Sequence, residues 1–267
     1  MKQVYYILFL SMILCVACEF KLKPGEDESQ APLLEVVRYD RLEYRYLTTG
    51  DFSALQEMNT EYPIETRTLI EDVLKLGTAT DPEINTKLLK FYQDTTLQML
   101  IADTEAEFAN MDDLNKELNM AFMKLKKWFP DMEIPQVYAQ ISALDESIVV
   151  GNQTIGISLD KYLGADYPYY KKLYPEVQRR QMTRDMILPE ALSFYLISIY
   201  SLPDFETRSQ EERDLHMGKI QWIVNQALDR HVYSTRFVHS VDTYMKKNPK
   251  VSYEELLKMT DFSEFDI

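Results

Sequence analysis

Carboxylate and tyrosine side chains are concentrated in one short segment past the middle of the chain. The cluster consists of Asp160, Tyr162, Asp166, Tyr167, Tyr169 and Tyr170. Acidic and phenolic groups where a strand runs into a loop could bind a cation, a sugar or a peptide. The alternative is structural, with the tyrosine rings covering the end of a sheet and their hydroxyls in water. We take Asp160, Tyr162, Asp166 and Tyr169 as candidate binding residues.

The chain is poor in residues that hold metal ions. It has three histidines, His216, His231 and His239, and no H-E-x-x-H sequence. No carboxylate flanks a histidine at the spacing that zinc ligands need. We therefore predict histidines that are hydrogen-bonded or face the solvent, no metal site and no cofactor.

One glycine-containing segment imitates a phosphate-binding loop. It runs from Gly151 to Ser158, but Ile157 stands where such a loop has lysine, and the segment alternates as a hairpin does. We predict no nucleotide binding. A serine-hydrolase triad has no support either, because the chain has no G-x-S-x-G elbow.

The composition is strongly acidic. The chain has 29 Lys and Arg against 43 Asp and Glu, a formal net charge of −14. Such a surface repels nucleic acid and anionic lipid headgroups. We expect proteins, neutral ligands or cations as partners, and no nucleic acid.

The N-terminus predicts export. Lys2 precedes an apolar run from Val4 to Ala17, which is too short for a membrane-spanning helix of about 20 residues, and Cys18 follows. The pattern resembles a bacterial lipoprotein signal, in which acyl chains such as palmitate are attached to the cysteine and hold the protein on a membrane. An ordinary secretory signal with a coincidental cysteine is the alternative. Because Cys15 leaves with the signal, the folded body has no free thiol for catalysis or disulfides.

Three regions follow from this interpretation. Residues 1–17 are the signal peptide, residues 18–34 are the lipidated cysteine and a polar, flexible tether, and residues 35–267 are one folded domain. The tether has no run of acidic residues directly after Cys18, a pattern that resembles a surface-export signal. We expect the protein on the periplasmic face of the outer membrane.

The body combines helices with a small sheet. Apolar residues recur at helical spacing in four segments, 84–99, 114–129, 220–228 and 237–245, and Ser252 with Glu255 forms a capping box before a last short helix. Residues 134–161 instead alternate as strands, with a two-residue turn at Gly151 and Asn152. We predict an α+β fold, predominantly helical, with about eight helices around a small antiparallel or mixed sheet.

The order of several short motifs resembles one family. They include Trp128-Phe129-Pro130, Leu159-Asp160-Lys161-Tyr162-Leu163-Gly164-Ala165-Asp166, Tyr169-Tyr170, Arg179-Arg180, Ile187-Leu188-Pro189-Glu190 and Val251-Ser252. This order resembles the gliding-motility lipoprotein B family (GldB) of Bacteroidetes. The resemblance covers nearly all of the body and implies an envelope lipoprotein tied to gliding, with no established biochemical activity.

The family also looks distantly similar to zinc metallopeptidases (zincins), whose helix carries H-E-x-x-H. If that similarity holds, the segment from Pro189 to Ser193 stands in the place of this motif, with Glu190 retained and both histidines replaced. Proline and serine cannot bind zinc, so the similarity implies an inactive, pseudoenzyme version of that fold. We add Glu190 to the candidate binding residues.

Three functions remain after these exclusions, of which the third is a specific partner of a motility or secretion machine. The first is a lipid-anchored envelope protein that binds or scaffolds a protein partner without catalysis. The second is a hydrolase of peptide or glycan that uses two of Asp160, Asp166 and Glu190 as acid and base, which requires two carboxyl groups about 5–10 Å apart in one cleft.

Overall fold

The computed structural model describes residues 34–265, which form one compact unit. The predicted signal peptide, Cys18 and residues 19–33 lie outside the described residues. The described part of the chain contains twelve α-helices and three strands, and helices dominate. This confirms the predominantly helical α+β class, with more helices than the eight expected, because several helices are only four to six residues long.

Five helices precede a long sixth one. Their bounds are α2 Tyr39–Thr49, α3 Phe52–Glu61, α4 Pro63–Thr68, α5 Ile84–Phe91 and α6 Thr95–Glu107, and the long helix is α7 Asp112–Trp128. Asp94 ends the predicted 84–99 helix, because its carboxylate accepts hydrogen bonds from the backbone N–H groups of Thr96 and Leu97 and so begins α6. The single helix predicted there is therefore wrong.

The C-terminal half has six helices after the sheet. They are α8 Tyr170–Leu173, α9 Glu176–Arg179, α10 Ile187–Ile199, α11 Gln210–Leu228, α12 Arg236–Lys247 and α13 Tyr253–Lys258. Both α11 and α13 begin with a capping box, the latter at Ser252 and Glu255 as predicted.

The sheet has three strands, β1 Gln136–Gln140, β2 Ile148–Gly151 and β3 Thr154–Ser158, in the order β1-β3-β2. Strand β1 is parallel to β3, and β2 is antiparallel to it. The hairpin turn falls on Asn152 and Gln153, one residue later than predicted, because Gly151 still pairs with Thr154 and Gln153 adopts a φ of 59°.

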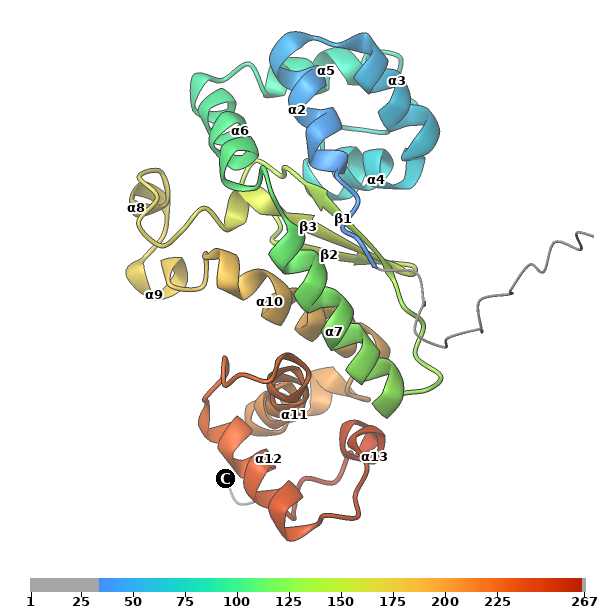
Figure 1. Cartoon of the computed structure of the whole chain (residues 1–267), viewed down its shortest axis with the longest axis vertical. Coiled ribbons are helices and arrows are strands. Elements are labelled where there is room, and N and C mark those ends of the chain that lie inside the picture. The colour runs from blue at the N-terminus through green and yellow to red at the C-terminus, as the bar shows by residue number, and fades with distance from the viewer. Residues whose placement is uncertain (1–33, 266–267) are drawn as a thin grey trace, which may run out of the picture. The chain divides into compact units, whose positions relative to one another are not determined.

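Each face of the sheet packs against its own group of helices (Figure 1). Val137, Ile155 and Ile157 belong to a core with α7, α10, α11 and α12, whereas Tyr138 belongs to a second core with α2–α6. Gly156 lies beside Tyr138 in register, and a Cβ at this position would lie 2.6 Å from the tyrosine ring. The glycine is therefore required for the close approach of the ring to the sheet.

Candidate functional site

A cavity of about 430 Å³ lies where the start of β2, α10 and α11 meet. Four lining residues come from α10, two from α11, one from the residue before β2 and one from the loop after α11. They are Ser147, Glu190, Ser193, Phe194, Ile197, Met217, Gln221 and Tyr233. Glu190 is the one carboxylate in this lining, and the rest is uncharged.

The Glu190 carboxylate is held by a buried tyrosine. The Tyr162 hydroxyl donates to Glu190 Oε2 at 2.7 Å, and the Tyr162 side chain is almost wholly buried. Burial raises the pKa of Glu190 above 4.5, while the Tyr162 and Ser147 hydroxyls oppose this shift by stabilising the charged form. The site therefore presents an oriented, partly desolvated acid to the cavity.

The Ser193 hydroxyl is engaged in hydrogen bonds within the cavity wall. It donates to the Pro189 carbonyl at 2.7 Å, four residues earlier in the same helix, and lies 3.3 Å from the Tyr233 hydroxyl. No base contacts it among the described residues. Pro189 itself lies in the first turn of α10, where its missing N–H leaves no unmade hydrogen bond.

The loop that brings Tyr233 into the cavity wall is held in place by one amide side chain. Asn225 accepts hydrogen bonds at 3.0 Å from the backbone N–H groups of Val232 and Tyr233, and donates to the Tyr233 carbonyl at 2.7 Å. This clamp fixes the loop after α11 and so places the Tyr233 ring in the cavity wall.

Asp160, the first acid of the carboxylate and tyrosine cluster found in the sequence, does not line this cavity. It is fully buried and accepts hydrogen bonds from Ser142 N at 2.9 Å and Leu144 N at 2.6 Å. Ala143 and Leu144 both have a positive φ, 54° and 68°. Asp160 therefore holds a strained turn that leads into β2, which is a structural role.

The remaining candidates are dispersed. Asp166 is exposed and forms an ion pair with Lys171 at 2.9 Å, and Tyr169 is half-buried in the same segment. Of the five predicted binding residues, the structure brings only Tyr162 and Glu190 together. Two carboxylates do not meet in the cavity, so it lacks the pair that the hydrolase hypothesis requires.

The histidines do not form a metal site. Among residues 34–265, no group of three or more His, Cys, Asp or Glu side chains could hold a metal ion. His231 and His239 are exposed. His216 is buried, and its Nε2 lies 2.7 Å from the Tyr200 carbonyl, so Nε2 carries the proton of the neutral ring.

These features can be compared with known proteins. The model of a protein family described as "Gliding motility protein GldB" matches residues 23–240, which includes every residue of the cavity. The chain belongs to the GldB family. No curated protein and no solved structure matches it. Within the described part of this GldB family member, no helix is both long enough and apolar enough to cross a membrane.

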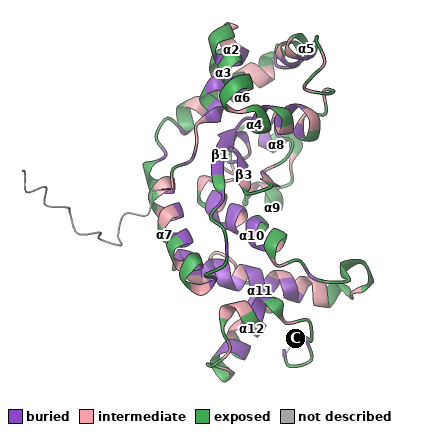
Figure 2. Ribbon diagram, turned by 90° about the vertical axis from the view of Figure 1, so that its right-hand side faces the viewer, coloured by how far each residue is buried: buried purple, intermediate pink, exposed green. Residues whose placement is uncertain are grey.

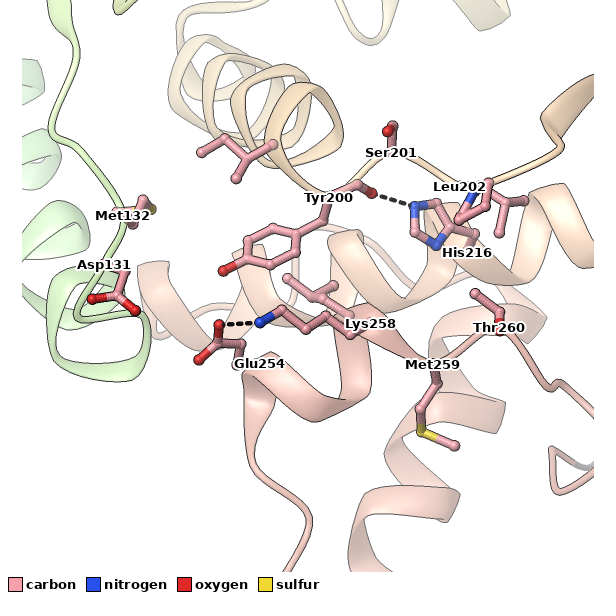
Figure 3. Close-up of a pocket in the computed structure, with 13 residues that line it drawn as sticks. Asp131, Met132, Tyr200, Ser201, Leu202, His216, Glu254, Lys258, Met259 and Thr260 are labelled. Atoms are coloured by element: carbon pink, nitrogen blue, oxygen red, sulfur yellow. Dashed lines mark hydrogen bonds and ion pairs between the residues drawn. The ribbon is translucent and has the colours of Figure 1, made fainter.

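A second cavity of about 430 Å³ lies between α10, α13 and the loop that contains Tyr200 (Figure 3). Its lining includes His216, and the ion pair of Glu254 with Lys258 lies at its side, with a distance of 2.6 Å. Burial, with a smaller effect of the Lys219 charge, lowers the pKa of His216 to about 4. His216 is therefore neutral at physiological pH, and this GldB cavity holds no charged histidine.

Sequence reasoning missed most of the cavity wall of this GldB protein. Ser147, Met217, Gln221 and Tyr233 are scattered over 87 positions and belong to no common motif. Phe194 is 46% exposed in the cavity wall, which its residue type alone does not predict.

Proposed function

We propose that this chain is a lipid-anchored protein of the cell envelope that binds an extended segment of a partner protein at β2 and the adjoining cavity, without catalysis. Membership of the GldB family supports an envelope-associated lipoprotein of the gliding-motility type. Acyl chains on Cys18 and a place on the periplasmic face of the outer membrane belong to this proposal.

The open edge of β2 is the observation on which the binding proposal rests. Ser158 N–H donates to Ser147 C=O at 3.0 Å, so in this antiparallel pair the backbone groups of Ser147, Val149 and Gly151 point towards β3. Those of Ile148 and Val150 then point to the other side, where no further strand of the described chain pairs with β2. An extended polypeptide is the ligand whose N–H and C=O groups repeat at the matching period.

The cavity supplies specificity for such a ligand. Phe194, Ile197 and Met217 offer an apolar wall for one side chain of the added strand. Glu190 offers an acceptor that Tyr162 already orients, which favours a ligand side chain that donates hydrogen bonds. The absence of a second carboxylate in the cavity lining favours binding over the hydrolase alternative.

The test is an amide hydrogen-exchange experiment with a library of short peptides. A peptide that binds by strand addition is expected to slow exchange at the Ile148 and Val150 amides, which are otherwise open. Val150→Pro removes the outward N–H group and is expected to abolish binding, while the matched control Val150→Thr keeps it.

Two results would contradict the proposal. One is peptide binding that Val150→Pro leaves intact, or that protects no β2 amide. The other is stoichiometric zinc in the purified protein together with peptidase activity, which would restore the hydrolase.

A further inference from the structure

The outer side of α7 carries an exposed stripe of methionine and lysine. Lys116, Met120, Met123 and Lys127 recur at spacings of four, three and four residues, so they lie on one side of the helix. All four are exposed, Met120 to 49% and Met123 to 70%. The buried residues Leu114, Leu118, Ala121, Phe122 and Leu125 lie on the opposite side and face the core. We call the four exposed residues the α7 stripe.

The charge of this helix differs from that of the protein. Helix α7 has a formal charge of +1, with Asp112 and Asp113 in its first turn and four lysines against one glutamate in residues 116–127, whereas the whole chain has a net charge of −14. Neither Lys116 nor Lys127 makes an ion pair or a hydrogen bond within residues 34–265. Glu117, the acid in the segment, forms an ion pair with Arg230 at 3.0 Å. Two uncompensated cations therefore flank two exposed methionines.

The described chain begins directly beside the stripe. Leu34 N–H donates to Asn119 Oδ1 at 2.6 Å, and Asn119 Nδ2 donates to the Leu34 carbonyl at 2.6 Å. Val36 is tied in the same way to Asn115 one turn earlier, with a distance of 3.0 Å. Leu34 and Val36 are thus fixed along α7, next to Met120 and one turn, about 6 Å, from Met123.

The position of this attachment limits the distance to the lipid. Residues 19–33 join Cys18 to Leu34, so even at full extension the covalent chain keeps Leu34 within about 55 Å of the lipidated residue. We infer that the α7 stripe is a second membrane contact, in which Met120 and Met123 enter the interface of a bilayer and Lys116 and Lys127 bind its anionic headgroups. This inference rests on the lipid anchor of the proposed function.

The chemistry of the stripe fits a lipid surface. Apolar side chains flanked by lysine place the methyl groups below the headgroups and the ammonium groups at the phosphates. Each lysine close to an anionic surface raises the equilibrium constant for membrane contact by about fivefold, and salt reduces this gain. The acyl chains on Cys18 supply the main attachment, and the stripe would fix which side of the protein faces the membrane.

The cysteine-free body permits a direct test with the full lipidated chain. Met123→Cys, labelled with an environment-sensitive fluorophore, reports on the stripe. Val177→Cys in α9 is the matched control, since Val177 is 76% exposed and α9 and α7 lie to different sides of the sheet in Figure 2. Both proteins are incorporated into vesicles of phosphatidylethanolamine and phosphatidylglycerol that contain a headgroup nitroxide lipid.

The expected result is quenching of the label at position 123 and not at position 177. Adding Lys116→Gln and Lys127→Gln is expected to shift the contact equilibrium by roughly 25-fold, while the exposed pair Lys171→Gln and Lys172→Gln has no effect. Equal quenching at both positions, in protein that floats with the vesicles, would overturn the inference and leave the anchor in place. Protein that does not float with vesicles would instead overturn the proposed lipid anchor, and the inference with it.

Discussion

Glu43 is expected to make the folded protein less stable as the pH rises. A carboxyl group whose pKa is lowered on folding has the opposite effect. This α2 side chain is fully buried, and its Oε2 accepts a hydrogen bond from Ile141 N at 2.7 Å, while Oε1 is buried with no partner. Burial raises the pKa of Glu43 well above its usual value, and the nearby charges of Asp40 and Asp160 raise it further. The folded protein therefore holds a proton on Glu43 that the unfolded chain releases.

The sign and size of the effect follow from this difference. Between the pKa of the unfolded chain and the higher pKa of the folded state, the folded state binds more protons, so its stability falls as pH rises. Glu43→Gln keeps the carbonyl that accepts from Ile141 and removes the titration. In that window the variant is expected to gain about 1.4 kcal/mol on the wild type for each pH unit.

Denaturant unfolding of the two proteins at a series of pH values from 5 to 8 measures this gain. Glu255→Gln is the matched control of opposite sign, because hydrogen bonds from Ser252 lower the pKa of Glu255. Its stability deficit relative to the wild type is expected to stay constant above pH 5 and to shrink as the pH falls below the usual glutamate pKa. Parallel stability curves for Glu43→Gln and the wild type would refute the assignment of a buried, protonated Glu43.

Three further predictions concern the site and the sheet. Asp160→Asn turns an amide N–H group towards one of the backbone N–H groups from which the carboxylate accepts hydrogen bonds, and is expected to lower the free energy of unfolding by about 2 kcal/mol. Asp166→Asn, at an exposed ion pair, is expected to leave it almost unchanged, and similar midpoints of thermal unfolding for the two variants would contradict this. Tyr162→Phe removes the hydrogen bond to Glu190 and is expected to raise the pKa of that carboxyl, which a carbon-13 NMR titration measures, and an unchanged value would show that the bond does not stabilise the charge. Gly156→Ala places a methyl group 2.6 Å from the ring of Tyr138 and is expected to lower the free energy of unfolding by about 1–3 kcal/mol. Denaturant unfolding identical to that of the wild type would show that the sheet accommodates the methyl group without loss of stability.

Local periodicity was sufficient to predict the helices that have one buried side. Leu114, Leu118, Ala121, Phe122 and Leu125 recur at helical spacing in α7, and all five are buried. Alternation also predicted the hairpin and its neighbouring strand, although β1 and β3 are buried on both faces of the sheet. The segment 84–99 failed because its apolar spacing continues across two helices, while Phe91 and Met99 are exposed. An N-cap aspartate decided the boundary there, and periodicity does not detect it.

The candidate site was less accessible to sequence reasoning. Glu190 and Tyr162 were both selected, and the bond between them was not foreseen because it joins residues 28 positions apart. Asp160 was selected for its charge, yet that charge serves the backbone of a turn whose left-handed residues, Ala143 and Leu144, give no sequence signal. A pattern of residue types does not distinguish a carboxylate that faces a ligand from one that faces its own backbone.

The central sheet separates two hydrophobic cores and belongs to both of them. Val137 and Tyr138 are neighbours in β1, but they contribute to different cores. A fragment that ended before β1 would leave α2–α6 without the strand that closes their core, and a fragment that began at β1 would expose that same side to water. Each half of the molecule thus needs the sheet to close its core, and neither is expected to fold as a separate module.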